Sequence, residues 1–489
     1  MKKKLARIYS VIVLVLCVSI VVQAQQPTTG TKINVGGVFP DLAMVAGHSP
    51  RTEAGIGAMV PWANRLWLVT YVAHMKRTGS GTGLYEIDET MTLRKRPESV
   101  VGTYANRLIH GPSNQLIIGP HIIDTLGNVR TIDGVKDHRL AATMEHLTDN
   151  NKVYFLAMEG QFFEVDVHTL ETKELFNLMD ELNEPKGSKP HFKSAFTHHG
   201  RVVVANNSYN TKDYNGQQRA GRLAEWDGKK WTVLEEFPFT EVFSARAFGQ
   251  PMFATGWDQK SVILKAFING AWKTYRLPKS SFAFDETSNT EWMRIREVET
   301  ERALMDCHGL FYELSYHTYG NSIWGIRPIS KHLRVVPDFC SWRGMLVLAG
   351  NQSTPMQFQT TNLDRNPLAG QPQAGLWFGK TDDLWSFGKP TGWGGPWHNT
   401  QVKAGEHSDP YLMTGFDKKV LHLKNNSNQS VKFTIEVDFI GSEEWTAYQT
   451  ITVPANGYVH HEFPDGYQAH WVRLVTDRPT SATAIFFYN

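Results

Sequence analysis

The stretch NKVYFLAMEGQFFEVDVHTLETKEL, residues 151–175, contains two short apolar runs separated by the turn residues Glu-Gly. A second turn signal, Asp-Val-His-Thr, precedes a third run of alternating character. Runs of about 5–8 residues rich in Val, Phe and Tyr and bounded by Gly, Asn or Asp are typical of β-strands joined by tight turns. The stretch therefore predicts three consecutive antiparallel strands and no helix.

The same succession returns along the chain at intervals of about 40–50 residues. About seven units can be distinguished, and no long pattern of helical period interrupts them. Clear examples are NRLWLVTYVA…GLYEIDETMTL, GRVVVANNSYN…GRLAEWDGKKWTVL, QPMFATGWDQKSVILKAFINGAWKTYRL and RGMLVLAGNQS…GLWFGKTDDLWSFG. A repeat of this length with about four strands is the signature of a β-propeller blade. The sequence predicts an all-β, seven-bladed β-propeller.

Three segments are expected along the chain. Residues 1–24 are typical of a signal peptide, with basic residues at 2–4, an apolar stretch and VQA before Gln25. Leu16 precedes Cys17 where a lipid-attachment motif needs a small residue, so we expect an exported protein, periplasmic or secreted, without a lipid anchor. Residues 25–405 would form the propeller. Residues 406–489 would form a small β-sheet or sandwich packed on it.

The charge of the chain excludes some partners. The formal net charge is +2, and the sequence has no block of Lys or Arg. Nucleic acid and anionic membranes are therefore not expected as partners, and no later apolar run has the roughly 18 residues of a membrane span. Aromatic residues make up 12% of the chain, which suits either β-strands or a surface that stacks on sugar rings.

Two cysteines follow the expected signal peptide, and histidines lie near both. Cys307 precedes His317, and His332 precedes Cys340. In an oxidising compartment two cysteines commonly form a disulfide. Two Cys and two His are also a tetrahedral ligand set for structural zinc, although the spacing matches no standard zinc finger. The sequence leaves a Cys307–Cys340 disulfide and a zinc site as equal alternatives, both of them structural.

The loop AGHSPRTEAGIGA, residues 46–58, places His48, Arg51 and Glu53 among small residues before the first strand. The chain has none of the common nucleophile, metalloprotease, P-loop or EF-hand motifs, so this loop is the first candidate site. A histidine transfers protons near neutral pH, and an arginine can bind a carboxylate through two hydrogen bonds. The alternative is an ordinary loop histidine beside an Arg51–Glu53 ion pair.

A second candidate set is spread over the early blades. Histidine, tyrosine and arginine together suit β-elimination at a uronate, because Arg neutralises the carboxylate while His or Tyr removes the C5 proton. The alternative is that these residues cap strands or fill the channel. The set comprises His110, His121, His146, His191, His198, His199, Tyr209, Arg219 and Arg222, of which His121, His146, His198, Tyr209 and Arg222 are the principal candidates.

Three stretches, residues 44–71, 144–171 and 191–210, resemble glycoside hydrolase family 145, and the AGHSPRTEAG loop is the most specific of them. The resemblance spans nearly the whole mature chain. It implies a seven-bladed propeller with α-L-rhamnosidase activity on L-rhamnose α-1,4-linked to D-glucuronate, at the ends of arabinogalactan side chains. It also implies a single essential histidine, here His48, on the posterior face of the propeller. Arg51, as a carboxylate clamp, and Glu53 are the candidate substrate-binding residues beside it.

The resemblance also supplies an alternative. The middle blades are similar to β-propeller ulvan lyases, which cleave at a uronate on the anterior face with His, Tyr and Arg. The expected partners are rhamnose-capped, glucuronate-containing oligosaccharides. No cofactor is expected for catalysis, and the zinc considered above would be structural. A propeller that binds glycan without cleaving it is the third possibility.

Overall fold

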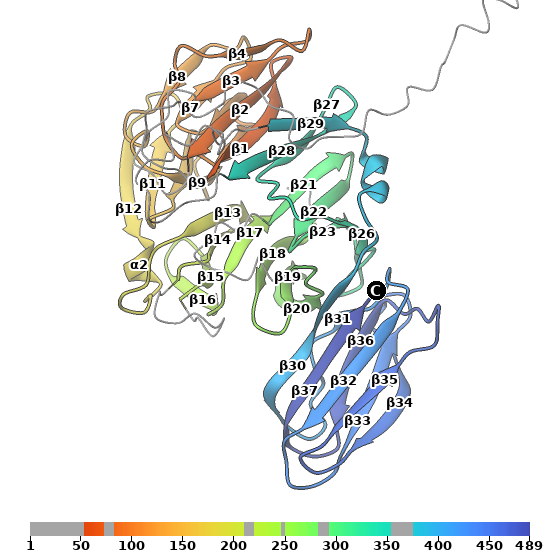
Figure 1. Cartoon of the computed structure of the whole chain (residues 1–489). Helices are drawn as coiled ribbons and strands as arrows, with labels where there is room; N and C mark the ends of the chain where they lie inside the picture. The colour runs from red at the N-terminus through yellow and green to blue at the C-terminus, as the bar shows by residue number, and fades with distance from the viewer. Residues whose placement is uncertain (1–52, 73–82, 210–219, 246–249, 282–292, 354–374) are drawn as a thin grey trace, which may run out of the picture.

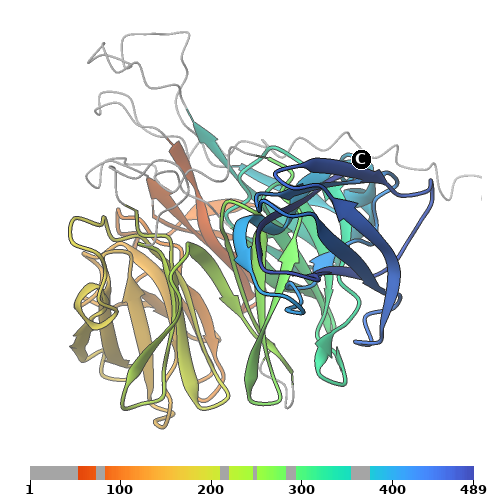
Figure 2. The same cartoon turned by 90° about the horizontal axis from the view of Figure 1, so that it is seen from below.

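The strands of the computed structural model form blades around a central axis, with a β-sandwich attached at one side (Figures 1 and 2). The structure describes residues 53–72, 83–209, 220–245, 250–281, 293–353 and 375–489. Within these ranges no helix is long and apolar enough to cross a membrane.

Blades 1 to 4 are antiparallel sheets of four strands each, in sequence order from the axis outward. Blade 1 consists of β1 (Glu53–Trp62), β2 (Arg65–Val72), β3 (Leu84–Ile87) and β4 (Leu93–Lys95), and blade 2 consists of β5 (Arg107–His110), β6 (Gln115–Ile118), β7 (His121–Ile123) and β8 (Val129–Thr131). Blade 3 consists of β9 (Leu140–Glu145), β10 (Lys152–Ala157), β11 (Gln161–Asp166) and β12 (Thr172–Asn177), and helix α2 (Leu178–Glu181) follows it. Blade 4 consists of β13 (Phe192–His198), β14 (Arg201–Asn206), β15 (Arg222–Trp226) and β16 (Trp231–Glu235).

Blades 5 to 7 complete the circle, and blade 7 is joined to blade 1 because β28 pairs with the start of β1. Their strands are, for blade 5, β17 (Phe239–Phe243), β18 (Met252–Trp257), β19 (Val262–Ile268) and β20 (Ala271–Leu277); for blade 6, β21 (Arg294–Glu299), β22 (Arg302–Cys307), β23 (Leu310–Ser315) and β26 (Arg327–Lys331), with the small hairpin β24 (Thr318–Tyr319) and β25 (Ser322–Ile323); and for blade 7, β27 (Phe339–Trp342), β28 (Met345–Ser353) and β29 (Gly375–Gly379), followed by the 3-10 helix η4 (Thr381–Ser386).

Two-residue turns set the register of several hairpins. Asn269 and Gly270 join β19 to β20 with φ of 51° and 85°. Two successive positive φ values define the turn that matches the right-handed twist of paired strands, and Asn-Gly is its preferred sequence. His199–Gly200 has the same geometry between β13 and β14, so His199 occupies a turn position.

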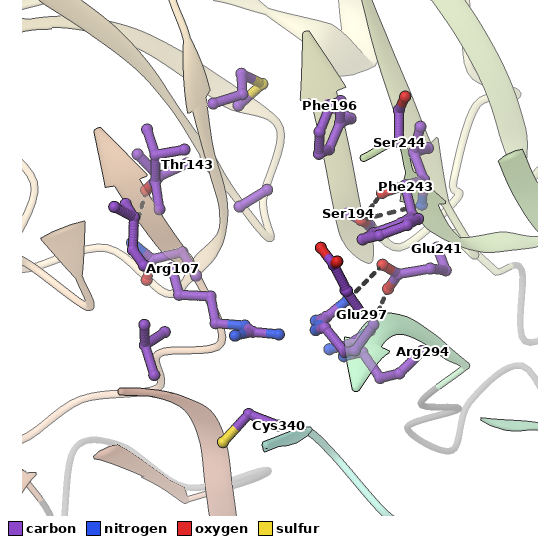
Figure 3. A pocket seen from close by; sticks show the side chains of 18 of the residues that line it. Arg107, Thr143, Ser194, Phe196, Glu241, Phe243, Ser244, Arg294, Glu297 and Cys340 are labelled. Carbon is purple, nitrogen blue, oxygen red and sulfur yellow. Dashed lines mark hydrogen bonds and ion pairs between the residues drawn. The ribbon is translucent and has the colours of Figure 1, made fainter. Parts of the chain in front are cut away.

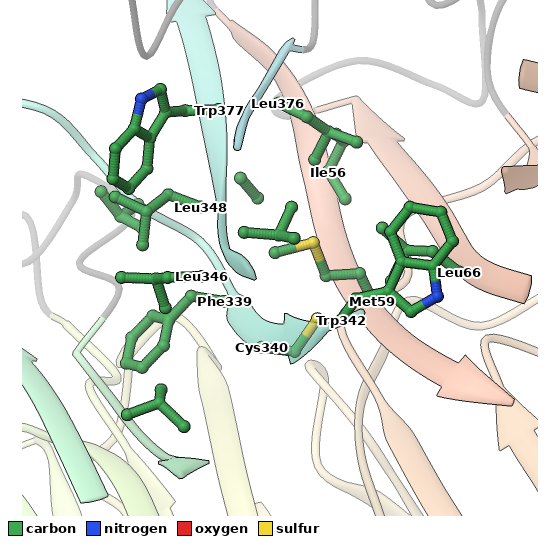
Figure 4. Packing of buried hydrophobic residues seen from close by; sticks show 14 of the residues in the cluster. Ile56, Met59, Leu66, Phe339, Cys340, Trp342, Leu346, Leu348, Leu376 and Trp377 are labelled. Atoms are coloured by element: carbon green, nitrogen blue, oxygen red, sulfur yellow. The ribbon is translucent and has the colours of Figure 1, made fainter. Parts of the chain in front are cut away.

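The faces of the blades are apolar because each blade is packed between two others. Between blades 7 and 1, Ile56 and Met59 of β1 pack in one cluster with Leu346 and Leu348 of β28 and with Trp377 (Figure 4). Each of these side chains is at most 4% exposed, and burying a side chain of this size contributes about 1.5–3 kcal/mol. The expected all-β propeller is confirmed.

The C-terminal unit is a β-sandwich of two four-stranded sheets around one apolar core. One sheet has the order β30-β37-β32-β35 and the other β31-β36-β33-β34. The strands are β30 (Gly392–Val402), β31 (Tyr411–Leu412), β32 (Lys419–Asn425), β33 (Val431–Asp438), β34 (Trp445–Val453), β35 (Tyr458–Glu462), β36 (Trp471–Thr476) and β37 (Thr480–Tyr488).

The boundary of this unit lies earlier than the sequence suggested. β30 pairs with β37 from Gly392 onward, so the sandwich begins before residue 406. The sandwich is fixed to blade 5, where Arg276 of β20 pairs in parallel with Tyr411 of β31. The Arg276 guanidinium also binds Asp409 in the connecting segment (Nε–Oδ2 2.7 Å) and Asp258 of blade 5 (Nη1–Oδ2 2.9 Å).

Candidate functional site

A cavity of about 650 Å³ lies on the propeller axis and is lined by the innermost strand of every blade. These strands are β1, β5, β9, β13, β17, β21 and β27. Figure 3 shows Arg107 reaching into the cavity from one wall, with Glu241 and Arg294 on the opposite wall. Ligand sites in proteins commonly occupy concave spaces of this size, so the cavity is the first candidate.

Asp338 holds two arginines of different blades at the cavity. Its side chain is completely buried just before β27. Its Oδ2 forms an ion pair with Nε of Arg107 at 3.1 Å and accepts a hydrogen bond from the Met59 backbone N–H at 2.8 Å, and its Oδ1 accepts from Nε of Arg296 at 2.8 Å. A buried carboxylate is stable when its oxygens are paired in this way, so Asp338 ties blades 1, 2 and 6 to blade 7.

Glu241 holds the third arginine. Its Oε1 binds Nη1 of Arg296 at 2.8 Å, and its Oε2 binds Nη1 of Arg294 at 3.0 Å. Three guanidinium groups therefore share the two carboxylates of Glu241 and Asp338, and the cluster carries an excess of positive charge. Burial lowers the pKa of Arg107 to about 10, and the Arg296 charge nearby acts in the same direction. Binding of an anion would relieve this excess.

Two of the guanidinium groups retain hydrogen-bond donors. Arg107 uses Nε for Asp338 and Nη1 for the Met59 carbonyl at 3.0 Å. Arg296 uses Nε for Asp338 and Nη1 for Glu241 and the Ile295 carbonyl. Among the described residues neither Nη2 has a partner, and both side chains line the cavity with exposures of 18% and 14%. Together they suit a carboxylate ligand.

The other end of the cavity is acidic. Arg107 and Arg294 stand at the first residues of β5 and β21, whereas Glu145 and Glu299 stand at the last residues of β9 and β21. Glu297 and Glu299 are exposed, and all three glutamates line the cavity. The cavity therefore passes from a buried cationic end to an exposed end with carboxylates that could accept a proton from water or from sugar hydroxyls.

The first candidate set falls almost wholly outside the described residues. His48 and Arg51 lie outside the described residues. Glu53 is the first residue of β1 and pairs with Ser353 of β28, but its side chain is outside the described part.

The second candidate set is divided by the structure. In blade 4, His198 pairs with Arg201 at one end of the β13–β14 hairpin, whereas Phe192 pairs with Asn206 at the other end. Arg222 pairs with Asn206 and so lies at the end away from His198. The prediction that the five principal residues converge is therefore wrong, because antiparallel pairing places His198 and Arg222 at opposite faces of the propeller.

The histidines of that set make local contacts. His146 binds Glu164 (Nε2–Oε2 3.1 Å), accepts from the backbone N–H of Asp149 through Nδ1 and packs on Tyr154. His121 is completely buried, and its Nδ1 lies 3.0 Å from Oγ1 of Thr131. Burial lowers the pKa of His121 to about 4, so it is neutral at physiological pH. Because its ring binds Glu164 and the Asp149 backbone, His146 is a structural residue of its turn.

Arg222 belongs to a network that the sequence predicted only in part. Asn206 accepts from the Arg222 backbone N–H at 3.0 Å and donates through Nδ2 to Oε1 of Glu184 at 3.0 Å. Burial raises the pKa of Glu184 to about 7, although the Arg222 charge opposes the rise. His191 and Tyr209 lie beside this network, with ring centroids 6.2 Å apart.

Asn207 adds a second sign of a polar site in blade 4. It is completely buried, and neither polar atom of its side chain has a partner among the described residues. Buried amides are normally hydrogen-bonded, so a ligand or water that completes these bonds fits the position. The Asn-Asn pair in GRVVVANNSYN was the available signal for it, whereas nothing in the sequence distinguished Glu184.

The expected cysteine site is corrected. Cys307 and Cys340 are not joined in a disulfide, and both thiols are buried. Cys307 contacts Sδ of Met293 at 3.4 Å in the core of blades 5 and 6, whereas Cys340 packs between blades 7 and 1 (Figure 4). His332 instead binds Asp306 (Nε2–Oδ1 2.9 Å), and His317 is exposed.

No zinc site forms from these residues either. Within the described ranges no three or more His, Cys, Asp or Glu side chains are grouped so that they could hold a metal ion. The four residues are close only in the sequence, because Cys307 lies in β22 of blade 6 and Cys340 lies in β27 of blade 7.

The sheet order and the axial cavity define this protein as a seven-bladed β-propeller with a C-terminal β-sandwich. Among solved structures it is similar to the β-propeller domain of Myceliophteria thermophila Cps50 (Swd1), with 12% identity over 68% of this chain and 99% of that chain and a TM-score of 0.37. It is also similar to YCF48 bound to D1 peptide, with 10% identity over 70% and 98% and a TM-score of 0.37. No protein-family model matches the chain, and no curated protein matches it.

Proposed function

We propose that this propeller is an exo-acting α-L-rhamnosidase that hydrolyses L-rhamnose from α-1,4-linked D-glucuronate at the ends of arabinogalactan side chains. The sequence support is the resemblance of the loop around His48 to glycoside hydrolase family 145. The structural observation that carries the proposal is the pair of guanidinium groups of Arg107 and Arg296, which line the axial cavity and whose Nη2 atoms have no partner among the described residues. A uronate carboxylate is the feature of the substrate that such a pair would bind.

The proposed chemistry divides between binding and proton transfer. His48 protonates O4 of the glucuronate as the glycosidic bond breaks, so that the leaving group departs as a neutral alcohol. General acid catalysis of this kind contributes about 10²–10⁴-fold. The remaining acceleration comes from stabilising the oxocarbenium-like rhamnosyl group and from holding the glucuronate in place. Arg51 and Glu53 stay as candidate substrate contacts, and the glutamates at the exposed end of the cavity are candidates for activating water.

The test is an incubation of the protein with gum arabic glycan while free rhamnose and ultraviolet absorbance are followed together. Hydrolysis releases rhamnose without a new absorbance, whereas lysis creates an unsaturated uronate that absorbs. Binding without catalysis gives neither signal. His48→Ala should abolish rhamnose release, and near wild-type turnover of this variant would end the assignment.

The second candidate function is a uronate lyase in blade 4. The observation in its favour is the network of Arg222, Asn206 and Glu184, in which Glu184 has a pKa of about 7 that suits a general base or acid at neutral pH. The His191 backbone is joined to this network through Ser208, and the His191 ring lies beside Tyr209. In this reaction a base removes the C5 proton, a C4–C5 double bond forms, and the C4–O bond breaks as its oxygen accepts a proton. Appearance of ultraviolet absorbance that Arg222→Gln abolishes would establish this alternative.

Export is proposed together with this function, on the basis of the expected signal peptide at residues 1–24. N-terminal sequencing of the protein from the exporting host should begin at Gln25. A chain that retains its first residues would contradict the proposal.

A further inference from the structure

A second cleft, of about 440 Å³, lies between blade 5 of the propeller and the C-terminal sandwich. The propeller contributes Lys273 and Tyr275 of β20, and the sandwich contributes Glu443, Trp445, Trp471 and Arg473. We propose that this cleft is a saccharide-binding site, separate from the axial cavity and independent of whether the axial cavity is catalytic. Clefts between packed units are common places for ligands, and this volume lies in their usual range.

Arg473 presents fixed donors to the cleft. Its Nε donates to Oε2 of Glu436 at 2.6 Å, and its guanidinium carbon lies 4.2 Å from the ring centroid of Trp445. One edge and one face of the guanidinium are therefore held, while Nη1 and Nη2 have no partner among the described residues. A planar donor group restrained in this way loses little entropy when it binds a ligand.

The cleft also contains a hydrogen-bond acceptor, the Glu443 carboxylate, and a further donor, the indole N–H of Trp471. Lys273 of the propeller binds Oε1 of Glu443 in the sandwich at 2.6 Å, and Glu443 is exposed, so its Oε2 can accept from a ligand. The indole of Trp471 is 1% exposed, and its Nε1 has no partner within the described ranges. A buried indole N–H without a partner is unusual, and a ligand hydroxyl could complete its hydrogen bond.

This combination of groups fits a sugar better than other ligands. Each sugar hydroxyl both donates and accepts a hydrogen bond, and the ring presents C–H groups that pack on aromatic walls. A simple anion would use the Arg473 donors but not the Glu443 carboxylate. An apolar ligand would leave both Arg473 and Trp471 unpaired, which costs binding energy.

The experiment measures retardation of the protein, starting at Gln25, in native gels that contain gum arabic polysaccharide. We expect the wild-type protein to be retarded, and we expect the apparent affinity to fall at least tenfold in Arg473→Gln. The matched control is Arg478→Gln, which removes an exposed arginine from the same sandwich outside the cleft and should be retarded like the wild type.

Several results would overturn the proposal. These are absence of retardation for the wild type, or equal retardation of Arg473→Gln and the wild type. Retardation that disappears in 0.5 M NaCl, an ionic strength at which the Debye length is only about 4–5 Å, would show ionic adsorption and also overturn it. If Arg473→Gln does not fold, Lys273→Gln on the propeller side provides the same comparison.

Discussion

Replacing Arg107 by Gln tests the proposed role of the axial cavity most directly. The substitution removes a guanidinium that lines the cavity and whose Nη2 has no partner among the described residues, while Arg296 and the Met59 N–H remain as partners of Asp338. Because both hydrogen bonds to the Asp338 carboxylate persist and only the ion pair with Arg107 is lost, the blade contacts should survive. The effect on catalysis should therefore exceed the effect on folding.

The size of the effect follows from the bond that is lost. A hydrogen bond between charged groups contributes about 1.5–3 kcal/mol, and each 1.4 kcal/mol corresponds to a factor of ten. If Arg107 binds the uronate carboxylate, kcat/KM for rhamnose release should fall by about 10- to 150-fold. Arg94→Gln is the control, because this arginine is 53% exposed on β4 and lies outside the cavity.

The assay compares two substrates, the rhamnosyl-glucuronate disaccharide and its methyl ester, which lacks the negative charge. Wild-type protein should prefer the acid, and Arg107→Gln should lose most of that preference. Thermal unfolding of both variants checks that the fold is retained. An equal fall on acid and ester, or no fall on either, would refute the carboxylate-binding role of Arg107.

Three further predictions concern stability and thiol chemistry. Because the pKa of Glu184 is raised to about 7, the folded state keeps a proton on Glu184 between the ordinary glutamate range and about pH 7, whereas the unfolded state releases it. The free energy of unfolding of the wild type should therefore decline across that interval relative to Glu184→Gln. Urea midpoints of the two proteins that change in parallel between pH 5 and pH 8 would contradict this. The chain starting at Gln25 should show two thiols with a thiol reagent after unfolding in urea and none before, because Cys307 and Cys340 are buried and are not joined in a disulfide; absence of thiols in urea would indicate a disulfide. Arg276→Ala should reduce the free energy of unfolding by about 3–5 kcal/mol, because it leaves Asp258 buried without its main partner, and chemical denaturation with an unchanged midpoint would refute this.

The propeller could be predicted because its evidence is local. A hairpin such as residues 262–277 shows apolar runs and turn residues within a few positions of one another, and the repeat of such units points to blades. The sandwich boundary was placed too late, because β30 pairs with β37 at the far end of the chain. Nothing in the sequence around Gly392 indicates that partner.

The cysteines show the limit of reasoning from spacing. Cys307 and Cys340 lie near histidines in sequence, but they belong to β22 of blade 6 and β27 of blade 7 and are buried in different clusters. Sequence proximity predicts contact only within a hairpin, whereas adjacent blades pack through faces that a strand pattern does not identify.

The sequence by itself determined the strands, their grouping into about seven units and the one loop, around His48, that resembles a known family of glycoside hydrolases. Those features depend on local pattern, because side-chain period and turn chemistry act over a few residues. Only the tertiary structure decided that Arg107, Arg296 and Asp338, from three blades, meet at the axis and leave donors facing one cavity. Closing the ring of blades brings residues far apart in the chain to a shared centre, and no local signal marks which charges will meet there.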